Sequence, residues 1–392
     1  MWLRIALKNY RSIESAEVEL APFTVLVGPN GSGKTNFVDA LVLSSELGRD
    51  AASAVQRRGG LGAIRRWGVG DADALRVRVR ASESKEELDS RYGEQSFSMV
   101  PEEGGRWRFL DETFEVVSPE HKALLATRQG GEVTQQDAFL RFSHLPPTTS
   151  MMLIAKQLSP SKFIDVHRLR LDLAEMTVPQ PPGEARQLQE NGSNIASVLG
   201  RLRGQDRRAF DFVLMSMRRL IPGLEDISVE EAGGFLVLRF SQRQPSGVAQ
   251  FAAANMSEGA LRALGIIVAA QTLSSVSSED EPDSPTQMLI VEEPEVAIHP
   301  GAAALLFEVL KLASQRGSVL VTTHSPELLD AAQDEEILVC GYRNGTTRIG
   351  PLSKAQREVV REGLLSLSEL ARSEPLRIEG EEPESLDPRE LT

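Results

Sequence analysis

The stretch FTVLVGPNGSGKTNFVDAL, residues 23–41, decides the fold of this chain. A short apolar run comes first, a glycine-rich turn follows it, and apolar residues at helical spacing come last. The turn matches the pattern G-x-x-x-x-G-K-[ST] at every fixed position. The stretch therefore predicts a buried strand, a phosphate-binding loop and a helix, in that order.

The residue types of the loop suit the binding of a nucleoside triphosphate. Glycines let backbone N–H groups turn toward an anion, and the helix N-terminus adds the positive end of a dipole. Lys34 is expected to reach the β- and γ-phosphates, and the hydroxyl of Thr35 to hold Mg²⁺. The predicted nucleotide-binding residues of the loop are Gly28, Pro29, Asn30, Gly31, Ser32, Gly33, Lys34, Thr35 and Asn36.

Composition predicts an ordinary globular protein. The 392 residues, 41% hydrophobic and 25% charged, suffice for one large domain or two modest ones. No run of about 18 apolar residues occurs, so we expect no membrane-spanning helix. The N-terminus shows no cleavage-site pattern, and the single cysteine, Cys340, excludes an internal disulfide. These features favour a cytoplasmic protein, with Cys340 packed in a strand.

Charge is distributed unevenly along the chain. The net charge of −13 argues against a uniformly basic nucleic-acid-binding protein, although arginines cluster locally. These clusters either form solvated faces or converge on one DNA-binding surface. The candidates for such a surface are Arg57, Arg58, Arg65, Arg66, Arg201, Arg203, Arg207 and Arg208. Acidic residues gather in 277–285 and 373–392, which we expect to be a flexible loop and a disordered tail.

The pattern along the chain predicts an α/β fold. Two strands lead into the loop strand, and alternating residues then predict an antiparallel meander. After residue 255, buried strands alternate with helices, which indicates a mostly parallel sheet shared with the loop strand and interrupted by an insertion. The predicted units are an N-terminal ATPase lobe (1–118), a mainly helical insertion (119–224), a C-terminal ATPase lobe (225–372) and the acidic tail (373–392).

The segment MLIVEEPE, residues 288–295, places two carboxylates directly after a buried strand. In α/β sheets, ligands bind at this carboxyl edge. Glu292 lies where the Mg²⁺-associated carboxylate of a Walker B strand belongs, and Glu293 lies where a base could polarise the attacking water.

Two further segments carry candidate residues. Ser257 begins an apolar-periodic helix; it either acts only as an N-cap or, with Gly259, exposes backbone N–H groups to a phosphate. His324 follows a buried strand and precedes a predicted helix over 326–333. It is either a structural residue or a hydrogen-bond donor to the γ-phosphate.

Taken together and in this order, the motifs resemble those of ABC-type ATPase heads, the group that includes SMC proteins, RecF and the overcoming-lysogenization-defect (OLD) nucleases. The opening LKNYRSI…VLVGPNGSGKTN resembles RecF and OLD ATPases, and VEEPEVAIHP and TTHSPELLD resemble OLD segments. The resemblance covers about 1–45 and 253–340. It implies an ABC-type P-loop head with a mixed sheet, an antiparallel β subdomain and a helical insertion.

The resemblance also implies roles for individual residues. ATP and Mg²⁺ would be held by Lys34, Thr35 and Glu292, Glu293 would be the general base, and His324 would sense the γ-phosphate. Ser257 and Gly259 would cap the nucleotide of a second subunit in an ATP-dependent homodimer.

The sequence departs from the family pattern in several places. The signature reads Met-Ser-Glu-Gly-Ala, without the paired glycines of transporters and SMC proteins, and Glu292 stands where Asp is commoner. The Q-loop residue stays open among Gln135, Gln136, Gln157 and Gln180. OLD nucleases continue into a C-terminal Toprim nuclease, and we expect that domain to be absent here.

Three functions are compatible with these motifs to different degrees. The first is an ATPase that dimerises on ATP and acts in DNA maintenance, repair or anti-phage defence, alone or with an effector protein. The second, a transporter subunit, is disfavoured because more than 220 residues separate the loop from the signature. The third is a non-catalytic ATP-gated sensor or scaffold for a protein partner.

Overall fold

The computed structural model describes residues 1–119, 121–129, 132–133, 164–183, 186–273 and 286–381. Three of the Q-loop candidates, Gln135, Gln136 and Gln157, lie outside these residues. The predicted acidic loop 277–285 and the last part of the predicted tail also lie outside them.

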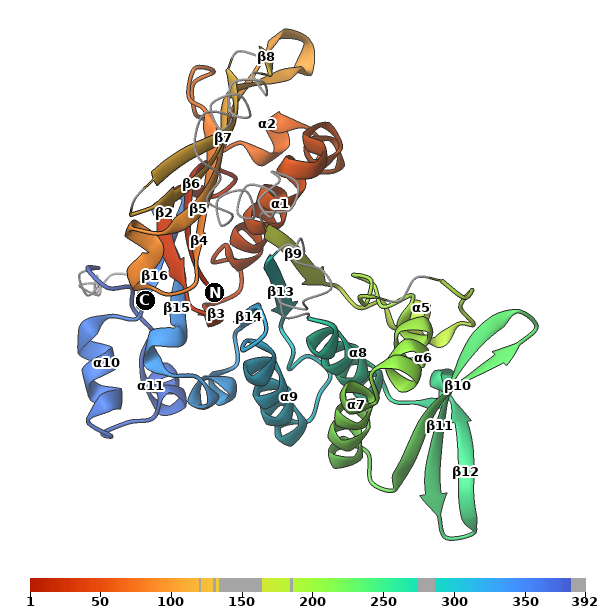
Figure 1. The fold of residues 1–392 in the computed structure, drawn as a ribbon. Helices are drawn as coiled ribbons and strands as arrows, with labels where there is room; N and C mark the ends of the chain where they lie inside the picture. The colour runs from red at the N-terminus through yellow and green to blue at the C-terminus, as the bar shows by residue number, and fades with distance from the viewer. Residues whose placement is uncertain (120, 130–131, 134–163, 184–185, 274–285, 382–392) are drawn as a thin grey trace.

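A six-stranded sheet in the order β16-β15-β3-β14-β13-β9 forms the centre of the molecule (Figure 1). All neighbouring strands in it are parallel except β16, which pairs with β15 in an antiparallel hairpin turning at Asn344 and Gly345. The strands are β3 (Phe23–Val27), β9 (Ile164–Leu169), β13 (Thr286–Glu292), β14 (Ser318–Thr323), β15 (Ile337–Arg343) and β16 (Thr346–Pro351). The predicted parallel sheet that includes the loop strand is confirmed.

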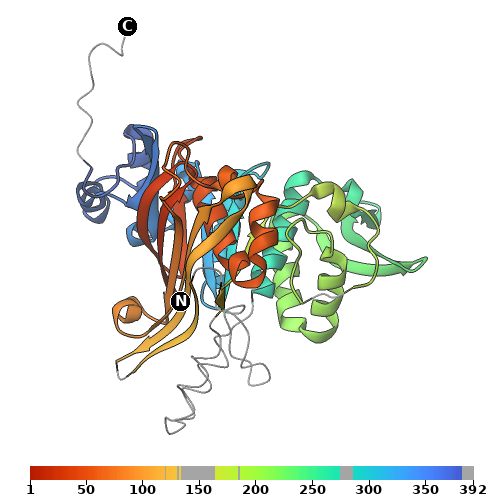
Figure 2. The ribbon, with the colours of Figure 1, turned by 90° about the horizontal axis from the view of Figure 1, so that it is seen from above.

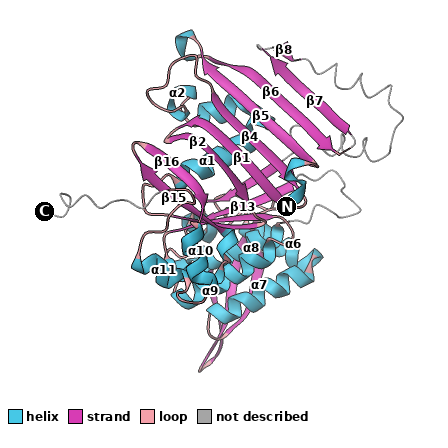
Figure 3. Ribbon diagram, turned by 90° about the vertical axis from the view of Figure 1, so that its left-hand side faces the viewer, coloured by secondary structure: helices cyan, strands magenta, loops and turns pink. Residues whose placement is uncertain are grey.

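A long antiparallel sheet in the order β2-β1-β4-β5-β6-β7-β8 lies beside the first helix (Figure 3). It contains the predicted meander. Its strands are β1 (Trp2–Tyr10), β2 (Ile13–Leu20), β4 (Leu75–Ser82), β5 (Tyr92–Pro101), β6 (Trp107–Ser118), β7 (His121–Gln129) and β8 (Glu132–Val133). The helices next to it are α1 (Lys34–Arg57) and α2 (Leu61–Ile64).

A helical lobe with a three-stranded antiparallel sheet extends from the opposite side of the molecule (Figure 2). The break between α6 and α7 falls at Asp206, whose side chain accepts a hydrogen bond from Ala209 N and so begins α7. The lobe comprises α5 (Leu173–Thr177), α6 (Ile195–Gln205), α7 (Arg207–Leu220), β10 (Leu224–Ala232), β11 (Phe235–Gln244) and β12 (Gly247–Ala252). The remaining helices are α8 (Glu258–Thr272), α9 (Pro300–Ala313), α10 (Lys354–Arg361) and α11 (Leu367–Ser373).

The two faces of the central sheet belong to two hydrophobic cores, because side chains alternate along each strand. Val25 and Val321 face the core that contains α6 to α9, whereas Leu26 and Leu320 face the core that contains α1 and the antiparallel sheet. Burial on both faces explains why these strands are continuous apolar runs in the sequence.

The structure differs from the expectations in three segments. Within 119–224, β7 extends the antiparallel sheet and β9 joins the central sheet, so the described helices begin only at α5. The predicted helix after His324 is a 3₁₀ helix, Pro326–Ala331. Residues 374–381 pack on the domain, because Ile378 is buried and bridges Leu352, so the part of the expected tail that the structure describes is ordered.

No helix in the described part of the chain is long and apolar enough to cross a membrane.

Candidate functional site

The phosphate-binding loop joins β3 to α1 in a conformation that requires its glycines. Gly31 and Gly33 have φ angles of 80° and 106°, which side-chain-bearing residues rarely adopt. A Cβ on Gly28 would lie 2.1 Å from the carbonyl oxygen of Cys340, and one on Gly33 would lie 2.1 Å from Thr347 Oγ1. The loop therefore lies directly against β15 and β16.

Three polar groups of this loop are arranged for an anion. Lys34 is buried, and its Nζ donates to the carbonyl oxygens of Gly28 at 2.7 Å and Pro29 at 3.1 Å. The buried hydroxyl of Ser32 has no hydrogen-bond partner among the described residues. No side chain caps the N-terminus of α1, which leaves its first N–H groups to a ligand. The loop fits a phosphate.

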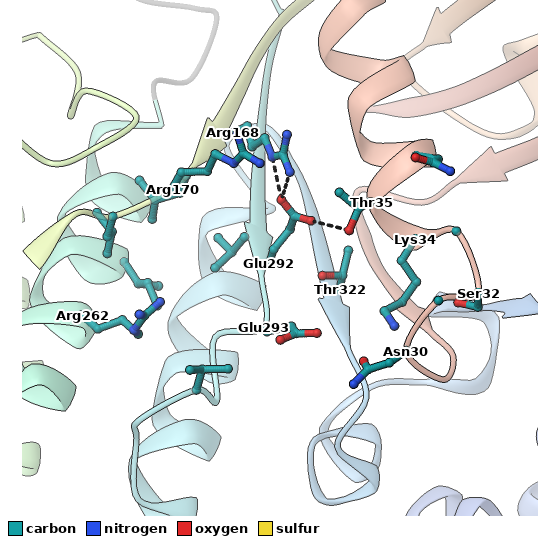
Figure 4. Close-up of a pocket in the computed structure, with 18 residues that line it drawn as sticks. Asn30, Ser32, Lys34, Thr35, Arg168, Arg170, Arg262, Glu292, Glu293 and Thr322 are labelled. Atoms are coloured by element: carbon teal, nitrogen blue, oxygen red, sulfur yellow. Dashed lines mark hydrogen bonds and ion pairs between the residues drawn. The ribbon is translucent and has the colours of Figure 1, made fainter. Parts of the chain in front are cut away.

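The first carboxylate of the EEPE segment faces the loop at the carboxyl edge of the central sheet. In the strand register, Thr322 on β14 lies between Glu292 on β13 and Leu26 on β3. Thr35 Oγ1 donates to Glu292 Oε2 at 3.4 Å (Figure 4). A hydroxyl and a carboxylate at this distance suit Mg²⁺, which keeps several waters and takes its other ligands from phosphates.

The second carboxylate lies next to the predicted γ-phosphate sensor. His324 Nδ1 is 3.3 Å from Glu293 Oε1 and 3.8 Å from Glu295 Oε1. Glu295 Oε1 in turn accepts a hydrogen bond from Thr323 Oγ1 at 2.5 Å. Glu293 has a φ angle of 47°, and such strain in a residue other than glycine is typical of functional sites.

A cleft of about 650 Å³ lies between the loop and these strands. The loop residues and the two carboxylates line it from two sides, while arginines line the far wall (Figure 4). The predicted residues in its lining are Asn30, Gly31, Ser32, Gly33, Lys34, Thr35, Asn36, Glu292 and Glu293. Gly28, Pro29, Ser257, Gly259 and His324 are not in the lining.

The signature residues lie at the exposed start of α8. Ser257 caps the helix, accepting a hydrogen bond from Ala260 N at 3.3 Å. A Cβ on Gly259 would lie 2.5 Å from the carbonyl oxygen of Ala297. Glycine therefore lets the start of α8 approach the loop that follows β13.

Sequence reasoning missed three arginines that line the cleft: Arg168, Arg170 and Arg262. Arg168 donates from Nε at 2.6 Å and from Nη2 at 2.5 Å to Glu292 Oε1. Arg168 and Arg170 belong to the segment HRLRLD, residues 167–172, whose alternation of polar and apolar residues could have identified a strand, although not its place beside the site. Gln180, the described Q-loop candidate, is instead buried and accepts from Ala196 N.

Several arginines expected on a DNA-binding surface have internal roles. Arg58 is an ion-pair partner of Asp39 and Glu46. Arg65 donates to the carbonyl oxygen of Asp73, and Arg66 to that of Ser12. These guanidinium groups thus contact α1 itself, the loop before β4 and the turn between β1 and β2. The DNA-binding surface stays a prediction. Arg207 and Arg208 on α7 are exposed.

The family model described as "AAA domain, putative AbiEii toxin, Type IV TA system" matches residues 23–330. The chain is also 22% identical to the Old nuclease of Escherichia phage P2 over 391 residues, covering 91% of this chain. It spans 62% of the length of that nuclease. The DNA replication and repair protein RecF of Erwinia tasmaniensis is 54% identical over 39 residues, which are 10% of this chain and 11% of RecF.

Solved SMC head structures share the fold. The SMC head bound to the C-winged helix domain of ScpA is 16% identical, with a TM-score of 0.54, and the match covers 91% of this chain and 98% of that one. The SMC head with an extended coiled coil bound to the C-terminal domain of ScpA, from Pyrococcus furiosus, is 12% identical with a TM-score of 0.51. That match covers 93% of this chain and 100% of that one.

Proposed function

The chain belongs to the AAA domain family that matches its residues 23–330, and on that premise we propose that it binds ATP with Mg²⁺ in the cleft and hydrolyses the γ-phosphate. Its fold is that of ABC-type ATPase heads of the SMC, RecF and OLD group.

The observation that carries this proposal is the meeting of the loop and the EEPE segment at one sheet edge. Thr35 and Glu292, 257 positions apart in sequence, are joined by a hydrogen bond. Lys34 and Glu293 line the same cleft. A phosphate-binding loop, a metal-binding pair and a carboxylate base are the parts that phosphoryl transfer to water requires.

Each residue has a distinct part in this reaction. Lys34 exchanges the carbonyls of Gly28 and Pro29 for phosphate oxygens and stabilises the charge that develops on them. Thr35 and Glu292 would hold Mg²⁺, which would supply neutralising positive charge at the phosphates. Glu293 accepts the proton of the attacking water, and His324 holds the Glu293 carboxylate from the neighbouring strand.

Ser257 and Gly259 are proposed to act on the nucleotide of a second copy of the chain. Neither residue lines the cleft beside its own P-loop, yet Ser257 is exposed at the N-terminus of the fifteen-residue helix α8. A helix N-terminus attracts phosphate. ATP bound between two such surfaces would stabilise a homodimer by mass action.

We place the protein in the cytoplasm, in DNA maintenance, repair or anti-phage defence, alone or with a separate effector protein. Support comes from the names of its relatives, a DNA replication and repair protein and a phage nuclease. The second candidate is an ATP-gated sensor or scaffold for a protein partner. It is supported by the SMC heads of similar fold, whose structures are bound to domains of ScpA.

Calorimetric titration with the slowly hydrolysed analogue ATPγS and Mg²⁺ tests the proposal. Wild-type protein should bind, and Lys34→Ala should lose about 10²-fold or more in affinity, because nothing nearby replaces its charge. Lys354→Ala, which removes an exposed lysine at the start of α10, is the control and should bind like wild type. Equal binding by Lys34→Ala and wild type would exclude this cleft as the nucleotide site.

A further inference from the structure

The ion pair between Arg168 and Glu292 lies within the candidate metal site. Only 8% of the Arg168 side chain is exposed. Both of its contacting nitrogens bind the same oxygen, Oε1, so Oε2 of Glu292 remains directed at Thr35 (Figure 4). The carboxylate that would hold Mg²⁺ is therefore already neutralised by a protein cation.

Sheet geometry fixes this contact. β9 is the edge strand next to β13, and Arg168 lies beside Ile290, two residues before Glu292. Its side chain reaches forward along the edge of the sheet to the carboxylate. β9 leads directly into α5 and the helical lobe, so the pair links the metal-binding carboxylate to that lobe.

A divalent cation at Glu292 and Thr35 would share its carboxylate with the guanidinium of Arg168. The repulsion between the two cations would disfavour metal binding in the absence of nucleotide. A bound nucleoside triphosphate would make metal binding favourable, because its γ-phosphate brings negative charge to both the metal ion and the guanidinium of Arg168. The planar guanidinium is also well suited to phosphate oxygens.

We propose that Arg168 makes metal binding at Glu292 conditional on a bound triphosphate, by neutralising the carboxylate in the absence of nucleotide and turning to the γ-phosphate when ATP binds. This inference rests on the proposed function and identifies Arg168 as a positioning residue for the metal. Among the described residues no glutamine lines the cleft, and three of the four Q-loop candidates lie outside the described residues.

Binding of Mn²⁺ to the nucleotide-free protein, followed by electron paramagnetic resonance, tests the first half of the proposal. Arg168→Gln should bind Mn²⁺ about tenfold more tightly than wild type, because a charge within about 4–6 Å shifts a neighbouring equilibrium by at least one such factor. The double variant Arg168→Gln/Glu292→Gln should lose that gain, which separates binding at Glu292 from binding to other carboxylates of the chain.

Two controls sharpen the measurement. Arg168→Lys keeps the charge and should leave Mn²⁺ binding close to the wild-type value. Arg76→Gln removes the same charge from an exposed position on β4 and should show no gain. Unchanged Mn²⁺ affinity in Arg168→Gln, or an equal gain in Arg76→Gln, would overturn the proposal.

The second half is tested by comparing ATPγS with ADP. Wild type should prefer the triphosphate, and Arg168→Gln should lose about tenfold of that preference while ADP affinity changes little. If wild type binds neither nucleotide, the proposed function fails. If wild type binds both and Arg168→Gln keeps the same preference, only the role of Arg168 is overturned.

Discussion

The Nδ1 atom of His324 lies 3.3 Å from Oε1 of Glu293, at the ends of two neighbouring parallel strands. Both residues come just after their strands, which pair as far as Glu292 and Thr322. The candidate base and the candidate γ-phosphate sensor thus lie side by side at the carboxyl edge of the central sheet.

His324→Ala should therefore reduce ATP hydrolysis while preserving nucleotide affinity. We expect a loss of about 10²–10⁴-fold in turnover, the usual contribution of a positioned acid–base group. Phosphate release and ATPγS binding, measured on the same preparation, check this. A variant with wild-type turnover would assign His324 a purely structural role.

Ser257→Asp should prevent ATP-dependent dimerisation without destabilising α8. Aspartate is as good an N-cap as serine, so the helix stays capped, but its negative charge repels a phosphate at that position. Sedimentation in a Glu293→Gln background, with and without ATP, measures the mass of the particle. The Glu293→Gln parent should double its mass with ATP, and Ser257→Asp should remain a monomer.

The corresponding control is Ser257→Thr, which keeps a hydroxyl cap and should still dimerise. A parent protein that shows no change of mass at micromolar concentration would count against the trans arrangement.

DNA binding, if it accompanies the ATPase, should depend on Arg207 and Arg208. Both are exposed on α7, whereas Arg65 and Arg66 donate to backbone carbonyls. Replacing Arg207 and Arg208 with Glu should weaken duplex binding and reduce the salt dependence by about 0.9 in log–log slope per lost phosphate contact. Fluorescence anisotropy with ATP at several salt concentrations measures this; an unchanged slope would make them ordinary surface residues.

His167 should make the fold sensitive to mild acid. Burial lowers the pKa of His167 below its ordinary value of 6.5, and its Nε2 has no hydrogen-bond partner among the described residues. The unfolded chain therefore binds a proton more readily than the native protein. The stability that comes from keeping His167 neutral in the native protein is fully present above about pH 6.5. It declines as the pH falls from 6.5 toward the lowered pKa of His167.

Thermal unfolding of wild type and His167→Gln at pH 7.5 and pH 5.5 measures this contribution. The midpoint of wild type should fall more between the two pH values than that of the variant. Equal falls would show that the imidazole is not the titrating group.

The sequence alone predicted the parts of the site whose chemistry is local. The P-loop and the EEPE strand are contiguous motifs, and burial on both faces makes their strands apolar runs that are readily recognised. Arg168 could not be assigned in the same way, because its importance comes from the pairing of β9 with β13 across more than a hundred residues. The internal roles of Arg58 and Arg65 were missed for the same reason: an arginine cluster does not show where its donors point.

The segment before β9 illustrates a further limit. A helical insertion was expected from residue 119, but β7 pairs with β6 in an antiparallel hairpin whose register shifts once, between Phe114 and Glu115. Strand propensity depends on such partners more than on the strand itself. In the expected tail, the spacing of Leu376 and Ile378 gave little sign that Ile378 would pack on Gly350.

The central claim is that Lys34 binds the phosphates of ATP in the cleft and that Glu293 acts as the base in its hydrolysis. Phosphate release by Glu293→Gln, compared with wild type and with the exposed-surface control Glu362→Gln, tests it most directly. The account predicts that Glu293→Gln binds ATPγS like wild type but releases phosphate about 10²–10⁴-fold more slowly, while Glu362→Gln matches wild type. Phosphate release by Glu293→Gln at the wild-type rate would contradict the account.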